Sequence, residues 1–185
     1  MSRADAATRI VGAAITLGAT NGVGAMSLQG IAAAAGVSKA LLLYHFKGKA
    51  ALRDAVVEAL SLASSARLRT AADATDAMRA WRALVRDETV HGEIALLAAL
   101  ALEADVAAEP LQRARTEREV AAVALATAIL GGLQLTPRVP PGLVGRLLLR
   151  QLDGLAAAAT RNGVPVDALE AELDVFALAL LSLGR

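Results

Sequence analysis

The sequence predicts an all-α protein, and its composition supports this fold class in three ways. Hydrophobic residues occupy 56% of the 185 positions but aromatic residues only 2%, so a core must be built from Ala, Leu and Val. Alanine is the strongest helix former, and no sustained alternating β-branched runs indicate strands. The chain has no cysteine, which excludes a disulfide framework and a thiolate metal site.

The most informative stretch runs from residue 27 to residue 49. Ser27 is a natural N-cap for a short apolar helix, and Gly36 can supply the left-handed backbone that ends this helix. Ser38 can cap the next helix after a short turn. Two short helices joined by a Gly-containing turn are typical of a helix-turn-helix, whose second helix enters a major groove of DNA.

Positive charge is concentrated in the N-terminal part of the chain. Residues 1–70 carry eight basic and three acidic side chains, whereas residues 71–185 carry eleven basic and fifteen acidic ones. The only lysines are Lys39, Lys47 and Lys49, all within or beside the second helix of the motif. A basic head on an acidic body is the charge distribution expected of a nucleic-acid-binding protein.

Residues 8–60 resemble the DNA-binding head of TetR-like (tetracycline-repressor-like) transcriptional regulators. The matching positions agree in order, spacing and residue type; they are Ile10, Ala13, Ala14, Leu17, Ser27, Ile31, Ala32, Ala35-Gly36-Val37-Ser38-Lys39, Leu42, Tyr44-His45-Phe46-Lys47, Lys49, Leu52 and Val56. The resemblance implies a helix-turn-helix head over residues 1–48, a connecting helix over 49–69, and an all-helical effector-binding and dimerisation domain over 70–185. Gly18 departs from the family, which usually has a large apolar residue there, and Gly30 replaces a residue that is commonly charged.

Periodicity and cap residues divide the chain into helices in order. The head is expected to contain helices over residues 6–19, 28–35 and 38–46, with the turn signal Asn21-Gly22 after the first. The connecting helix is expected over 49–68. The body is expected to contain helices over 76–89, 93–107, 110–133, 143–160 and 167–183. Pro110 suits a first helical turn, and Asp167 is the predicted N-cap of the last helix, in a capping box with Glu170.

The predicted DNA-binding surface is the second helix of the motif together with its flanks. Leu42 and Phe46 share the side that faces the core, so Ala40 and Tyr44 lie on the outer side. Tyr44 and His45 can donate to phosphates, and Lys49 lies at a helix N-terminus, which also favours a phosphate. The candidate DNA-binding residues are Ser27, Gln29, Ser38, Lys39, Ala40, Leu41, Leu43, Tyr44, His45, Lys47 and Lys49.

Several of these candidates also have a purely structural interpretation. Ser27 is first of all a helix cap, and His45 can equally be a hydrogen-bonded histidine at a helix end. Leu43 stands where the family commonly has a tyrosine that touches the DNA backbone, and Leu41 replaces a common small polar residue. Each leucine can either pack against a neighbouring helix or meet thymine methyl groups in the major groove.

The body is expected to form a dimer. The helices over 143–160 and 167–183 are more apolar than their own core requires, which predicts a subunit interface. The resemblance likewise implies that the last two helices of two subunits form a four-helix interface. The candidate interface residues are Leu148, Leu152, Leu155, Phe176 and Leu180.

The body is also expected to bind a small molecule. A pocket of Leu, Ala and Val with one or two polar groups would suit an apolar effector. Its candidate lining residues are Trp81, His91, Glu93, Leu97 and Gln151. The two histidines, His45 and His91, are too far apart in sequence to indicate a metal site, and no cofactor is expected.

Taken with the resemblance, these features predict a homodimeric, ligand-responsive transcriptional regulator, with repression as the leading interpretation, bound to a double-stranded operator of approximate twofold symmetry. The alternative is a helical interaction or ligand-binding protein whose head no longer binds DNA. An enzyme is not expected, because the carboxylates of the body show no nucleophile–base or metal-ligand spacing. Residues 120–137 suit a buried bundle helix better than a membrane span, and the expected location is the cytoplasm.

Overall fold

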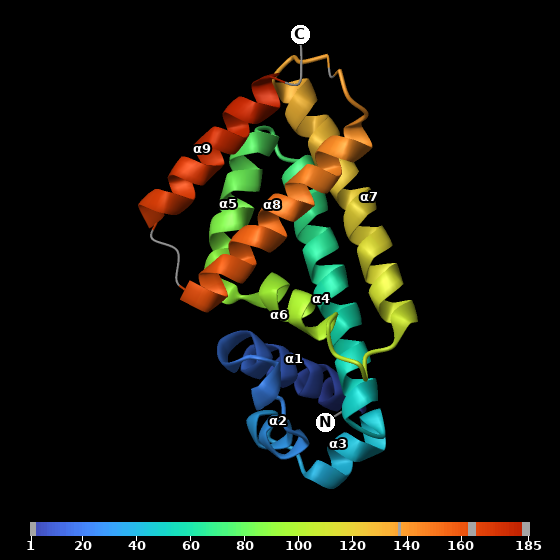
Figure 1. The fold of residues 1–185 in the computed structure, drawn as a ribbon. Coiled ribbons are helices and arrows are strands. Elements are labelled where there is room, and N and C mark those ends of the chain that lie inside the picture. Colours follow the sequence, from blue (N-terminus) through green and yellow to red (C-terminus); the bar gives the residue numbers. More distant parts are fainter. Residues whose placement is uncertain (1–2, 137, 163–165, 183–185) are drawn as a thin grey trace.

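The computed structural model describes residues 3–136, 138–162 and 166–182, and the regular structure in these ranges is entirely helical, which confirms the predicted fold class. Three helices form a small head at one end of the molecule (Figure 1): α1 (Arg3–Asn21), α2 (Leu28–Ala34) and α3 (Lys39–Phe46), with the 3-10 turn η1 (Val23–Ala25) between the first two. α4 (Lys49–Ala72) runs from the head into the body. The body is completed by α5 (Ala77–His91), α6 (Glu93–Leu100), α7 (Ala108–Gly132), α8 (Pro141–Asn162) and α9 (Val166–Ser182).

The helix-turn-helix forms for the local reasons that the sequence indicates. Ser27 caps α2 and Ser38 caps α3, because each hydroxyl accepts a hydrogen bond from the backbone N–H three residues later, at 3.0 and 3.1 Å. Gly36 has a φ of 63°, and the N–H groups of Gly36 and Val37 close the last turn of α2 at 3.1 and 2.9 Å. Both predicted caps and the helix-ending glycine are confirmed.

One hydrophobic core joins the head to the body. Ile10 and Leu42 of the head are completely buried in the same cluster as Leu96 and Leu100 of α6. The predicted boundary after residue 48 therefore falls within a continuous core. Because α6 packs directly on the head, a displacement of α6 would also displace the helices of the head that it contacts.

A second core fills the body around Trp81, whose side chain is fully buried. Helices α4, α5, α7, α8 and α9 all contribute to it. Within the ranges that the structure describes, no helix is both long enough and apolar enough to cross a membrane.

Several predicted helix ends are wrong, and tertiary contacts explain two of the differences. α6 ends at Leu100 rather than at residue 107, and acidic residues of the following turn bind the buried Arg53 of α4. α9 begins at Val166, so Asp167 lies in its first turn instead of capping it. Glu170 forms no capping box and instead pairs with two arginines of α5. α4 also continues to Ala72, past the predicted end at residue 68.

Candidate nucleic-acid interface

α3 presents an exposed outer face at the end of the molecule farthest from the body (Figure 1). Leu42 is fully buried and Phe46 packs against the head core, as predicted, so the opposite side of the helix is turned outwards. Tyr44 is 61% exposed and Leu43 is 37% exposed. Leu41 is half-buried, and neither leucine belongs to the core that joins head and body. This placement favours the surface interpretation of the two leucines over packing within the head.

The flanks of α3 supply the positive charge and the polar groups. Each predicted DNA-binding residue is at least partly exposed. Lys47 adopts a left-handed conformation, with a φ of 50°, and ends α3. Lys49 is the first residue of α4, whose first turn has no side-chain cap, so its N–H groups remain available to an anion. This junction between α3 and α4 is therefore suited to bind a phosphate of the DNA backbone.

Arg9 is a head residue whose role the sequence analysis missed. Its guanidinium donates to the backbone carbonyls of Ala35 and Gly36, at 3.3 Å for the latter, and so ties α1 to the turn of the helix-turn-helix. A cation is favoured there because the carbonyl groups at a helix C-terminus carry partial negative charge. The available signal was an arginine inside the otherwise apolar run of the first helix.

The family model for bacterial regulatory proteins of the tetR family matches residues 10–56, the segment that contains this interface. The head of this chain is TetR-like. No curated protein matches the sequence closely. The chain as a whole shares its fold with solved structures of transcriptional regulators, at low sequence identity.

Three solved structures illustrate the shared fold. A transcriptional regulator from Rhodococcus sp. Rha1 is 24% identical, with a TM-score of 0.75 over 95% of this chain and 96% of that chain. A TetR family transcription regulator from Marinobacter aquaeolei VT8 is 21% identical, with a TM-score of 0.65 over 92% of this chain and 93% of that one. NalD, the secondary repressor of the MexAB-OprM multidrug efflux pump in Pseudomonas aeruginosa, is 18% identical, with a TM-score of 0.59 over 99% and 98%.

Gly18, one of the two departures from the TetR-like pattern, is explained by the contact between α1 and α6. A Cβ atom at this position would lie 2.8 Å from Cδ1 of Leu96 and 2.8 Å from Sδ of Met26. Leu96 belongs to α6, so its side chain occupies the space beside Gly18 that a large side chain on α1 would otherwise fill. The glycine thus allows the body to dock closely on the TetR-like head.

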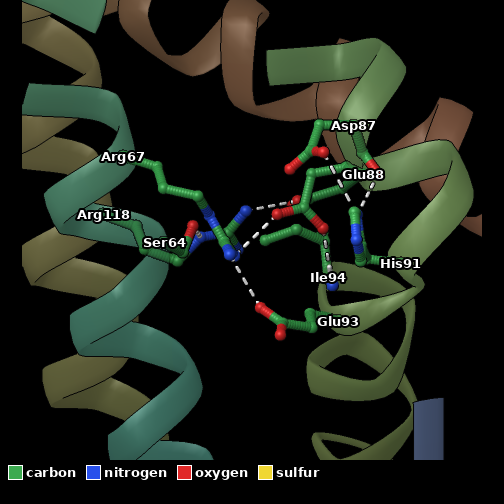
Figure 2. Close-up of polar contacts among 9 residues, drawn as sticks. Ser64, Arg67, Asp87, Glu88, His91, Glu93, Ile94 and Arg118 are labelled. Atoms are coloured by element: carbon green, nitrogen blue, oxygen red, sulfur yellow. Dashed lines mark hydrogen bonds and ion pairs between the residues drawn. The ribbon is translucent and has the colours of Figure 1, made fainter. Parts of the chain in front are cut away.

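A cluster of charged side chains around the buried Glu88 joins α4 to the point where α5 turns into α6 (Figure 2). Arg67 of α4 lies between two carboxylates, 2.6 Å from Glu88 and 2.8 Å from Glu93. Glu88 is only 1% exposed and accepts a hydrogen bond from the backbone N–H of Ile94 at 3.2 Å. Burial raises the pKa of Glu88, and the charge of Arg67 opposes that shift. The cluster therefore fixes three helices at one point, and its stability depends on the arginine.

The residues predicted to line an effector pocket do not surround one cavity. Trp81 lies inside the body core, and Glu93 is held by Arg67. His91 is exposed at the end of α5, where the carbonyl and the carboxylate of Asp87 raise its pKa. Leu97 lines a cleft between α6, α7 and α8, whereas Gln151 lines a shallow hollow between α8 and α9. Periodicity alone could not show which helices border the same cavity.

The predicted dimer residues require a similar correction. Leu148, Leu152, Leu155 and Leu180 are at most 4% exposed, because they form the core of the single chain. Phe176 is half-buried and lines the hollow between α8 and α9. The predicted leucines lie on the sides of α8 and α9 that face the core of the same chain. The outward side of α9 carries exposed apolar residues, namely Val175, Leu178 and Leu181.

Several carboxylates of the body are engaged in ion pairs. Arg53 binds both Glu103 and Asp105, and Arg118 binds Asp153 at 2.5 Å. Within the described ranges, no group of three metal-ligating side chains is present. These carboxylates thus have a structural role that accounts for their positions.

Proposed function

We propose that this protein is a homodimeric transcriptional repressor that binds operator DNA through α3 and is released by a small molecule bound in its body. The observation that carries the proposal is the outer face of α3, which is exposed, flanked by Lys39, Lys47 and Lys49, and part of a TetR-like head. Repression is the preferred output because one structure of the same fold, NalD, is described as a repressor.

The proposed dimer uses the outward sides of α8 and α9. Val175 and Leu178 are 67% and 66% exposed, which is unusual for large apolar side chains on one helix. The hollow beside them, lined by Gln151, Phe176 and Ala179, could receive side chains of a second copy. Twofold symmetry would then place two copies of α3 in successive major grooves, about 34–36 Å apart.

The proposed mode of DNA reading follows from the side chains on α3. Its outer face contains no Arg, Asn or Gln, the residues that make two hydrogen bonds to guanine or adenine. Leu41, Leu43 and Ala40 can instead contact thymine methyl groups, while Lys39 reaches a guanine or a phosphate. Specificity would further depend on the sequence-dependent shape of the DNA, and affinity on phosphate contacts.

A selection of duplexes from random DNA tests this function. The full-length protein should enrich a motif with approximate twofold symmetry whose half-sites are centred about 10 base pairs apart. A protein that retains only an interaction role would enrich no motif. Failure to enrich any motif, together with no measurable binding to random DNA at low salt, where phosphate contacts are strongest, would support the alternative of a head that no longer binds DNA.

A further inference from the structure

A cleft of about 530 Å³ opens between α6, α7 and α8 of the body. Its lining includes apolar side chains from all three helices, among them Leu97 of α6, Leu111 of α7 and Leu149 of α8. The volume lies within the range of about 300–1,000 Å³ that is typical of small-molecule sites. The cleft thus has room for a ligand and an apolar surface to receive part of it.

The lining of the cleft also carries an excess of positive charge. Four arginines line the cleft, Arg115, Arg118, Arg146 and Arg150, against only two carboxylates, those of Glu119 and Asp153. This excess is notable because residues 71–185 as a whole carry more acidic than basic side chains. A surface that contacts only water gives no reason for such a local excess of positive charge, whereas a site for an anion does.

Among the described residues, two of the four arginines form ion pairs with carboxylates and two do not. Arg115 binds Glu119 at 3.1 Å, and Arg118 binds Asp153. Arg146 and Arg150 lie one turn apart on α8, on the same side of the helix, and neither has an acidic partner in the part of the chain that the structure describes. Guanidinium groups present paired N–H donors that match the oxygens of a carboxylate or a phosphate.

We infer that this cleft binds the effector, and that the effector is an anion with an apolar tail. The carboxylate or phosphate group binds Arg146 and Arg150, and the tail packs on the leucines that line the cleft. This inference rests on the proposed function and specifies its effector, for which the sequence alone predicted an apolar molecule. The ligand class follows from the arginine excess, which only the folded chain brings together.

Two contacts connect the cleft with the head. Arg118 also donates to the hydroxyl of Ser64 at 3.2 Å, and Ser64 belongs to α4, which begins at the DNA-binding Lys49. α6 supplies Leu97 to the cleft, while the neighbouring Leu96 of the same helix packs on Gly18 of the head. An anion that attracts Arg118 or displaces α6 therefore shifts α4 and α1, the two helices that position the helix-turn-helix.

Calorimetric titration of the full-length protein tests the inference directly and does not require DNA. The probes are sodium decanoate, decyl phosphate and decanol, which share a tail and differ in the head group. At least one of the two anions should bind about tenfold or more tightly than decanol, because charge-assisted hydrogen bonds form only with the anions. Equal affinity for all three probes, or binding of none of them, would overturn the inference.

Two variants place the binding in this cleft. The double substitution Arg146→Gln and Arg150→Gln should weaken binding of the anion by about tenfold or more and leave decanol unaffected. The control Arg79→Gln removes an exposed arginine of α5 outside the cleft and should bind the anion like the unaltered protein. Unchanged affinity in the double variant would contradict the site. The operator affinity of each variant without ligand, measured separately, shows whether the proposed function itself holds.

Discussion

At the scale of single residues, the structure assigns roles that depend on only one or two contacts. Gly36 and the cap residues could be predicted from sequence, because their function is local and needs only the neighbouring backbone. Arg9 and Arg67 could not, because their partners lie far away in the chain, across the turn of the helix-turn-helix and at the junction of α5 and α6.

Removal of Arg67 should destabilise the fold. Arg67→Ala leaves the carboxylate of Glu88 buried without its counter-charge, and the expected loss in free energy of unfolding is about 3 kcal/mol. The double variant with Glu88→Gln as well should recover most of this loss, because the amide is neutral and can still accept from the N–H of Ile94. Urea unfolding measures both. If the double variant is no more stable than the single one, the buried charge is not the cause.

Lys49 should act through phosphates and not through bases. Lys49→Ala should weaken binding to the operator and to random DNA alike, since phosphates carry no sequence information. The plot of log affinity against log salt should become flatter by about one unit of slope. Gel-shift titrations at several salt concentrations give both quantities. A variant with altered base preference and an unchanged salt slope would show that this lysine reads sequence.

At the scale of helices, the existence and order of the elements were predictable, whereas their ends and their faces were not. Every expected helix is present, because the apolar periodicity and the turn residues that predict a helix depend only on residues close together in the sequence. The predicted end of α6 and the predicted start of α9 were wrong. In both places an acidic residue, Glu103 or Glu170, binds arginines of another helix. The outward side of α9 could not be chosen from the sequence, because the second half of this helix is apolar on both sides.

The docking of α9 on α5 should depend on pH. Hydrogen bonds from Arg86 and Arg82 lower the pKa of Glu170 from 4.5 to about 2. A lowered pKa stabilises the folded state above pH 4.5, and this contribution disappears as the pH falls from there to about 2. Glu170→Gln should therefore lower Tm at pH 7, and its difference from the unaltered protein should shrink below pH 4.5.

The comparison needs a variant on the same helix. Glu172→Gln removes an exposed carboxylate of α9 that has no arginine partner in the described part of the chain, so its Tm should follow the unaltered protein at each pH. Thermal melts between pH 7 and pH 3 compare the three proteins. A difference for Glu170→Gln that stays constant over this range would mean that the ion pairs do not hold α9 in place.

At the scale of the whole molecule, the proposed function requires two copies. Leu178→Glu should give monomers, because it places a charge in the middle of the proposed interface. Leu62→Glu on α4 is a matched control, since Leu62 is 60% exposed and Leu178 is 66% exposed, and this variant should remain a dimer. Sedimentation velocity distinguishes the two states. Dimers in both variants would move the interface away from α9.

The outer face of α3 is the proposed operator-binding surface, and one pair of variants shows whether this face contacts DNA. Ala40 of α3 and Ala66 of α4 are both exposed helical alanines, so replacement of either by Glu makes the same chemical change in the head or in the body. The affinity of each variant for a selected operator is the quantity to measure. Ala40→Glu should weaken binding by about tenfold or more, because a carboxylate meets phosphates and base acceptors, whereas Ala66→Glu should bind like the unaltered protein. Equal affinity of the two variants for the operator would show that α3 does not contact the DNA.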